Sequence, residues 1–146
     1  MLIQVVVFPG VDELDAIAPF EVLSMAARHA TGWRVELVAA VATETVATAN
    51  GLKLLTEADP LSLRRRPDLL IVPGGGWADR AAVGARAEVA SGALPRLIAE
   101  LHAAGTVIAS VCTGALIVAA AGILKGRPAV THHLAVADLR ATGAQI

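Results

Sequence analysis

The amino-acid sequence predicts an α/β fold, with a mostly parallel sheet sandwiched between helices. Short apolar runs alternate with segments that have helical spacing. Residues 2–8 and 69–72 are almost wholly apolar, which is typical of strands buried on both faces of a parallel sheet. Small and polar residues follow these runs directly, where folds of this class place their sites. We therefore expect one sheet with a functional site at the carboxyl ends of its strands.

The composition predicts a single domain spanning residues 1–146. With 55% hydrophobic residues, the chain can bury a substantial core. The formal net charge of −1 gives no general attraction to nucleic acid, so we expect no direct nucleic-acid binding. A single cysteine excludes an internal disulfide and fits a reducing compartment. The N-terminus lacks the basic region and cleavage site of a signal peptide, so we expect a cytoplasmic location.

The first strand, residues 2–8, ends at a Pro-Gly pair. Residues 11–18 are expected to form a loop that carries Asp15. Pro19 suits the first turn of a helix because its missing N–H has no intrahelical acceptor there. Residues 20–28 supply apolar side chains at helical spacing. This first part of the chain therefore predicts a strand, an acidic loop and a helix.

Residues 33–41 predict a second strand. Residues 43–55 are polar and β-branched around one glycine, which predicts a small edge hairpin. An Asp-Pro pair opens a short helix or turn over residues 59–66. The three consecutive arginines at 64–66 are expected to be a solvated loop rather than a nucleic-acid patch.

A buried strand at residues 69–72 runs into the Pro-Gly-Gly-Gly sequence of residues 73–76. Glycines directly after a strand let backbone N–H groups approach a ligand closely, although the same glycines can simply form a turn. Residues 77–91 have the polar character of a loop. Residues 94–104 place apolar side chains on one face and predict an amphipathic helix.

Residues 106–124 predict a strand, a sharp turn and a helix, with Cys112 at the turn. Residues 107–111 are rich in β-branched side chains, as a central parallel strand is, and residues 115–121 favour helix. This arrangement is a nucleophile elbow, which exposes the side chain at the turn. Unpaired N–H groups and the helix dipole favour the thiolate there, so we expect a thiol pKa below the usual value of about 8.5.

Position alone leaves two other interpretations of residues 106–124 open. An uncharged run of this length can cross a membrane, but its serine, threonine and glycine residues favour the buried elements of an α/β protein. Alternatively, Cys112 can be an inert core residue, because free cysteine is often buried. We expect no membrane contact.

Residues 129–131 predict a short strand that leads to His132 and His133. Residues 134–141 predict a helix, and residues 143–146 are typical of the opening of another strand. Either histidine can act as a base, or can simply satisfy its own hydrogen bonds. The spacing of the pair matches no recognised metal-ligand pattern, so we expect neither a metal nor a cofactor.

Four candidate positions follow predicted strands: Asp15, residues 74–76, Cys112 and His132. The first strand of such a sheet is usually central, so Asp15 and Cys112 are expected to lie close together. Asp15 can instead be a capping residue of the helix near Pro19. An acid that touches a thiolate has a raised pKa, and such a carboxyl can donate a proton to a substrate.

Three segments carry a resemblance to a known family: VVVFPGVDELDAIAPFEVL, LLIVPGGG and ASVCTGALIVAAAGILKGRPAVTHH. They resemble the ThiJ/PfpI superfamily, which has the flavodoxin-like fold of class I glutamine amidotransferases. The Cys-Thr-Gly elbow and the upstream LDxxxP are most similar to the isonitrile hydratase branch, and also to the amidase-like domain of AraC-type regulators. Family members usually continue with further strands and a closing helix, which leaves open that this chain lacks them.

The resemblance implies roles for individual residues. Cys112 would be the nucleophile and Asp15 its acid partner. Oxyanion-type donors would lie near Gly74, Gly75 and the Cys112–Thr113 backbone. Thr113 stands where the protease-like branch has histidine, which argues against a peptidase, and its hydroxyl can orient a substrate or a water molecule. His132 matches the family's Thr-His pair and would contact the substrate.

Three functions are consistent with these residues. The first is hydration of an isonitrile to an N-substituted formamide, with attack by Cys112 and protonation by Asp15. The second is a glyoxalase-like enzyme that acts on a 2-oxoaldehyde. The third is the ligand-sensing domain of a regulator. The expected partners are a small-molecule substrate and a second copy of the chain, because so apolar a sequence exposes a patch that favours a homodimer.

Overall fold

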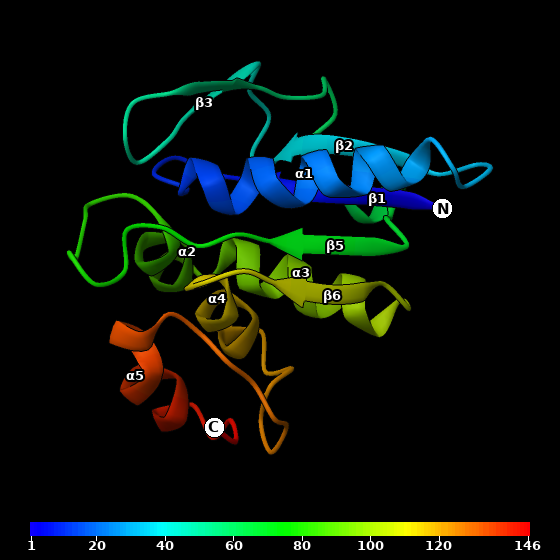
Figure 1. Cartoon of the computed structure of the whole chain (residues 1–146). Helices are drawn as coiled ribbons and strands as arrows, with labels where there is room; N and C mark the ends of the chain where they lie inside the picture. Colours follow the sequence, from blue (N-terminus) through cyan, green and yellow to red (C-terminus); the bar gives the residue numbers. More distant parts are fainter.

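Four parallel strands form the central sheet of the computed structural model, which describes residues 1–146 (Figure 1). Their order is β2-β1-β5-β6. Their bounds are Leu2–Val7 for β1, Arg34–Ala39 for β2, Leu69–Val72 for β5 and Val107–Ser110 for β6. β1 is an inner strand, with Val5 opposite Leu37 on one side and opposite Ile71 on the other. The predicted α/β fold with a parallel sheet is confirmed.

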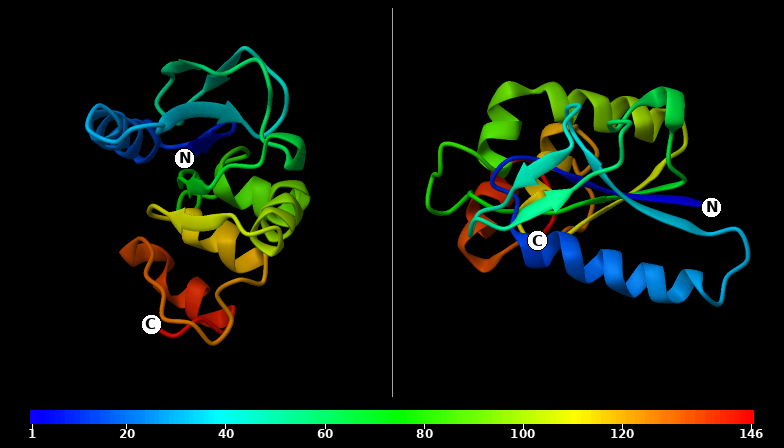
Figure 2. Two further views of the ribbon diagram at one scale, coloured as in Figure 1. Left: turned by 90° about the vertical axis from the view of Figure 1, so that its right-hand side faces the viewer. Right: turned by 90° about the horizontal axis from the view of Figure 1, so that it is seen from above.

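Helices cover the sheet on both faces (Figure 2). Helix α1 (Glu13–Ala27) lies on one face, while α2 (Ala85–Ser91), α3 (Ala93–Ala103) and α4 (Gly114–Ala120) lie on the other. Apolar side chains of the strands and helices form one main core, which includes Val5, Val7, Leu70, Ile98 and Ile117. A smaller cluster joins α4 to η2 (His133–Ala135) and α5 (Val136–Ala141) through Leu116, Ala135 and Leu139.

The expected edge hairpin is present as β3 (Thr45–Ala47) and β4 (Lys53–Leu55), which pair antiparallel in a separate sheet. Two backbone hydrogen bonds connect this hairpin to the loop after β1. Gly10 N–H donates to the Ala47 carbonyl over 2.9 Å, and Ala49 N–H donates to the Val11 carbonyl over 2.9 Å. The hairpin is therefore held beside the carboxyl end of β1, although it lies outside the main sheet.

Helix α1 begins at Glu13, so the expected loop at residues 11–18 is wrong. The N-cap is Asp12, whose Oδ1 accepts from Leu14 N–H over 3.0 Å. Acidic residues in the first turn favour this start, because the positive end of the helix dipole lies there. Pro19 lies inside the helix rather than in its first turn. Because proline has no N–H, the Asp15 carbonyl receives no regular bond from Pro19.

Two further differences concern short segments. Residues 77–91 are not all loop, since α2 (Ala85–Ser91) forms within them. Residues 129–131 form no strand; instead Pro128 and Gln145 make an isolated parallel bridge. The predicted helix over residues 134–141 is divided between η2 and α5.

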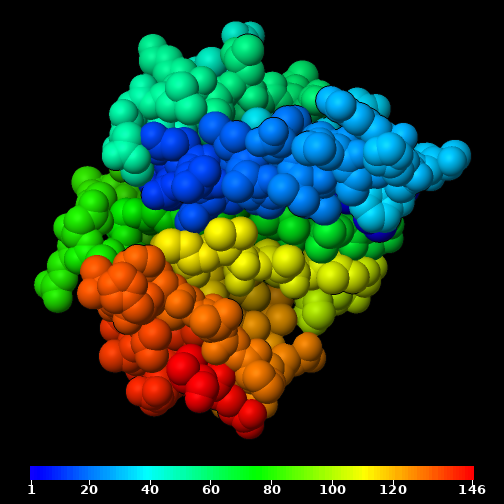
Figure 3. Space-filling model, in the orientation of Figure 1, coloured from blue at the N-terminus to red at the C-terminus, as the bar shows by residue number.

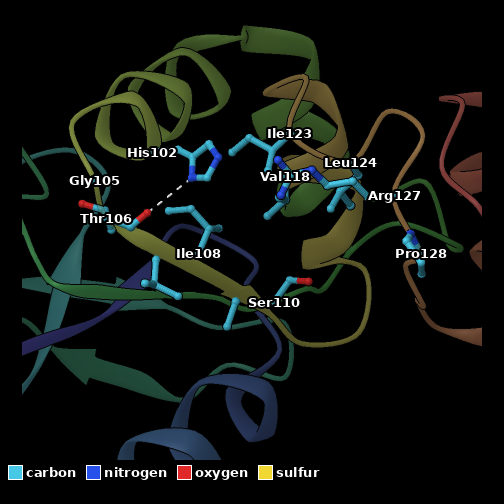
Figure 4. A pocket seen from close by; sticks show the side chains of 12 residues that line it. His102, Gly105, Thr106, Ile108, Ser110, Val118, Ile123, Leu124, Arg127 and Pro128 are labelled. Carbon is cyan, nitrogen blue, oxygen red and sulfur yellow. Dashed lines mark hydrogen bonds between the residues drawn. The ribbon is translucent and has the colours of Figure 1, made fainter.

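Strand β6 is an edge strand, contrary to the expectation of a central position. Val107 is 62% exposed, and the β6 region is visible on the surface between α1 and the C-terminal segment (Figure 3). A groove of about 460 Å³ runs along the strand, and Ile108, Ser110 and Arg127 line it (Figure 4). The apolar sequence of β6 predicts burial, but an apolar sequence alone does not distinguish a central strand from a strand at the edge of the sheet. No helix of this structure is both long and apolar enough to cross a bilayer.

The arginine run at residues 64–66 is not simply solvated. Arg65, in η1 (Leu63–Arg65), forms an ion pair with Glu36 of β2, and Arg34 binds the same carboxylate. Only 1% of the Glu36 side chain is exposed, and Gln4 Nε2 also donates to it over 3.1 Å. Arg65 therefore neutralises a buried charge and attaches η1 to the sheet.

Candidate active site

Three of the expected site residues meet at the carboxyl ends of the strands. Asp15 lies in the first turn of α1, Gly74 follows β5, and Cys112 follows β6. β2 pairs with one side of β1, and β5, which comes later in the chain, pairs with the other side. This reversal is the topological switch point at which parallel α/β sheets form their binding crevice.

Cys112 occupies the turn between β6 and α4 in a left-handed conformation, with φ of 53°. Such a φ is strained for a residue with a side chain, and this strain often accompanies a functional position. Two residues later the turn requires a glycine, Gly114, because a Cβ at that position would collide with the Val72 carbonyl oxygen. The turn therefore presents the thiol at the end of the sheet, as the sequence predicts for a nucleophile elbow.

The Asp15 carboxyl lies beside the Cys112 thiol, close enough for its charge to act on the sulfur. Gly74 N–H donates to Asp15 Oδ2 over 3.2 Å and fixes the carboxyl in place. Burial, reinforced by the nearby Asp12 charge, raises the pKa of Asp15 above its ordinary value. The direction is as expected, but its main cause is burial rather than repulsion from a thiolate.

The pKa of the Cys112 thiol is raised, not lowered. Burial is the main cause, and the negative charge of Asp15 adds to it. The polar groups of Thr113 act in the opposite direction but do not prevail. The expectation of a depressed thiol pKa is therefore wrong, because it considered the helix dipole without the burial of the sulfur and the adjacent carboxylate.

Thr113 is buried, with only 4% of the residue exposed, and it supports the glycine loop. Its Oγ1 accepts from Gly75 N–H over 3.0 Å. Because Gly74 N–H donates to Asp15, the two expected glycine donors are already engaged inside the protein. The N–H groups of Cys112 and Thr113, the other expected donors, have no backbone acceptor.

Gly75 brings the loop after β5 against the loop after β1. Its φ is 123°, and a Cβ there would lie 2.5 Å from the Gly10 carbonyl oxygen. In the same contact, Asp12 N–H donates to the Gly74 carbonyl over 2.9 Å. A glycine at this position therefore allows the two loops to approach closely enough to place Asp15 beside Cys112.

His132 lies at the rim of the site and makes no hydrogen bond to Cys112. Its Nδ1 accepts from Leu134 N–H over 3.3 Å, so it caps η2, and its ring stacks on His133 with centroids 4.1 Å apart. Thr131 Oγ1 donates to the Cys112 carbonyl over 3.0 Å and holds this segment against the elbow. Sequence reasoning missed the Thr131 contact, because the two bonded residues are 19 positions apart and meet only in the fold.

A pocket of about 310 Å³ opens above the thiol. Sequence reasoning missed two of its walls, Asn50 from the hairpin and Trp77 directly after the triple glycine. Trp77 Nε1 donates to Asp138 Oδ2 over 2.6 Å, and the Arg86 guanidinium lies 4.6 Å from the centre of its ring. The other lining residues include Asp12, Gly75, Cys112, Thr113 and His132. No group of three metal-ligating side chains is present.

Comparison with known proteins gives matches along the whole chain. Residues 1–146 match the DJ-1/PfpI family. A Streptomyces lividans protein, described as an uncharacterized protein in the cpoL 5′ region, is 36% identical over 137 residues. That alignment covers 94% of this chain and 91% of the relative.

Solved structures have the same fold. A ThiJ/PfpI family protein from Pseudomonas syringae is 26% identical, with a TM-score of 0.78 over 98% of this chain and 55% of its own. Schizosaccharomyces pombe DJ-1 is 18% identical, with a TM-score of 0.75 over 99% of this chain and 75% of its own. The chain spans 38% to 75% of the first three solved structures it matches. The chain belongs to the DJ-1/PfpI family, whose members include enzymes with a cysteine nucleophile.

Proposed function

We propose that this protein is a cysteine-dependent enzyme that hydrates an isonitrile to an N-substituted formamide. The observation that carries the proposal is the position of the Asp15 carboxyl beside the Cys112 thiol, where Gly74 N–H holds it. The raised pKa of Asp15 favours a carboxyl that can hold and return a proton. A nucleophile and a proton donor are therefore neighbours before substrate enters.

In the first step, the Cys112 sulfur bonds to the terminal carbon of the isonitrile. The thiol proton passes through the Asp15 carboxyl to the same carbon, which thereby gains one bond to sulfur and one to hydrogen. The product is a thioimidate, in which the nitrogen keeps its substituent and Asp15 returns to its starting protonation state. This step combines covalent catalysis with general acid–base catalysis.

In the second step, water adds to the thioimidate carbon, and the nitrogen takes one proton from that water. The carbon–sulfur bond then breaks, the remaining hydroxyl proton returns to sulfur through Asp15, and the N-substituted formamide leaves. The sum is isonitrile plus water giving formamide, so the reaction consumes no oxidant or reductant.

Attack on an isonitrile carbon develops no oxyanion in the first step. This step therefore does not need the N–H groups of Gly74 and Gly75, which already donate to Asp15 and Thr113. The pocket, at about 310 Å³, lies at the small end of the range for ligand sites and suits a small molecule.

The test is formamide formation from cyclohexyl isonitrile, followed by NMR or chromatography. We expect turnover by the wild type and none by Cys112→Ala. Asp15→Asn keeps an acceptor for Gly74 N–H but cannot carry the proton, so turnover should fall about a hundredfold or more. Glu21→Gln removes an exposed charge from the same helix and should keep full turnover.

Other outcomes contradict the proposal. If Asp15→Asn keeps wild-type turnover, Asp15 is not the proton carrier. If methylglyoxal is converted and isonitrile is not, the enzyme belongs to the 2-oxoaldehyde class. Saturable binding of small electrophiles without turnover of either compound would instead indicate a ligand-sensing domain.

A further inference from the structure

A second hollow lies at the carboxyl ends of β1 and β2, and residues of β3 also line it. Its volume is about 370 Å³, and it shares no lining residue with the pocket above Cys112. The apolar residues that reach its surface include Val41, which is 76% exposed, and the exposed Ala42 and Ala47. The hollow therefore offers an apolar surface of ligand size outside the candidate active site.

Glu88 of α2 is the only charged residue that lines this hollow. Its carboxylate makes neither an ion pair nor a side-chain hydrogen bond; the three ion pairs of the structure involve Glu36 and Asp138. Burial alone raises its pKa, which agrees with the lack of a nearby cation. A partly buried carboxylate without a partner is unfavourable, and a cation that enters the hollow would relieve that cost.

The polar atoms around Glu88 do not suit a metal ion. Ca²⁺ and Mg²⁺ need about six oxygen ligands, and the hollow has a single carboxylate among mainly apolar side chains. The Thr43 hydroxyl on its rim already donates to the Thr45 carbonyl over 2.9 Å. An organic ammonium needs only one carboxylate and an apolar surface for its hydrocarbon part.

We propose that this hollow binds a small alkyl amine, with its ammonium group paired to Glu88 and its hydrocarbon body against Val41, Ala42 and Ala47. The ammonium group of such a ligand matches the isolated Glu88 carboxylate, and its hydrocarbon part matches the apolar residues of the hollow. The site does not use Cys112, so this inference is independent of the proposed isonitrile chemistry.

The hollow adjoins the supports of the active-site loops. Ala85 N–H, at the start of α2, donates to the Gly75 carbonyl over 2.7 Å. Ala47, on the opposite wall, accepts from Gly10 N–H. A bound amine would therefore rest between two segments that contact the loops around Cys112, without touching the thiol.

The experiment is a calorimetric titration with cyclohexylamine near pH 7, with cyclohexanol as the neutral analogue of the same shape. We expect saturable amine binding by the wild type and by Cys112→Ala. Glu88→Gln and the change of ligand to cyclohexanol should each weaken binding by about tenfold, because each removes one charge of the pair. Glu100→Gln, which removes an exposed charge from α3, should bind the amine like the wild type.

Two further measurements locate the ligand. Amide NMR shifts on amine addition should cluster in residues 39–47 and 85–91, and Ala42→Trp, which fills the hollow without changing charge, should abolish them. Equal binding by Glu88→Gln and wild type, no binding at millimolar amine, or shifts centred on Cys112 would each overturn the proposal.

Discussion

The contact between Asp15 and Cys112 couples the protonation of the two side chains. Burial raises the pKa of both groups, and the charge of Asp15 raises that of the thiol further. The carboxylate form of Asp15 therefore opposes the thiolate, while the neutral carboxyl does not. We therefore expect thiol reactivity to depend on the protonation state of Asp15.

Asp15→Asn should lower the pKa of the Cys112 thiol, because the substitution removes a negative charge beside the sulfur. The wild type should show an alkylation midpoint above the ordinary thiol value of about 8.5, since burial and Asp15 both raise it. The midpoint of Asp15→Asn should lie at lower pH. The measurement is the iodoacetamide alkylation rate against pH; an unchanged or higher midpoint in the variant would contradict the electrostatic argument.

Part of the site could be predicted from residue positions alone. Strand ends indicated that Asp15 and Cys112 meet, because parallel strands bring their carboxyl ends together. The direction of the thiol pKa could not be predicted, since it depends on burial and on the distance to Asp15. Likewise, the engagement of Gly75 N–H by Thr113 joins residues 38 apart and follows from packing rather than spacing.

At the scale of elements, η1 is attached to the sheet through one buried carboxylate. Arg65 contacts Glu36, whose side chain is 1% exposed. Arg65→Ala should lower the free energy of unfolding by about 1–3 kcal/mol, because a buried charge loses a partner while Arg34 and Gln4 remain.

The matched control is Arg64→Ala, since Arg64 forms no ion pair with Glu36. We expect that variant to stay within about 0.5 kcal/mol of the wild type in urea unfolding. Equal midpoints for the two variants would show that the Arg65–Glu36 pair contributes nothing measurable to stability.

The sequence predicted most elements but not all of their limits. The inner strands β1 and β5 could be predicted because short, almost wholly apolar runs are typical of strands buried in a parallel sheet. Pro19 suits the first turn of a helix and so predicts a start for α1 that is too late, because the N-cap is Asp12. Helix α2 was missed because seven residues carry too short a periodic pattern to be distinguished from loop.

At the scale of the whole molecule, the open edge at β6 supports a homodimer. The strand lacks the lysine, proline or bulge that usually protects an edge, and Val107 is 62% exposed. Ile108 and Ser110 point their backbone groups away from β5, because Val107 N–H and Val111 N–H bond to that side. Two copies can pair these groups across a two-fold axis.

Val107→Lys should weaken association, because lysine on an edge strand opposes pairing with a second edge. Light scattering at micromolar concentration should show a dimer for the wild type and a shift toward monomer for this variant. Val22→Lys changes a residue of similar exposure, 65%, on α1 and should leave the dimer intact. A wild-type monomer, or equal effects of both lysines, would exclude β6 as the interface.

The central position of β1 also has a consequence for the order in which the protein folds. β1 leaves the ribosome first, but its partner β5 follows much later; Leu2 and Asp68, which bond at this junction, are 66 residues apart. The apolar strand therefore has only β2 as a partner until β5 has been made. Cys112 comes later still, so Asp15 has no thiol beside it until β6 docks on β5. Parallel pairing over such separations is slow, so assembly of the reactive pair should follow formation of the β1–β2 pair.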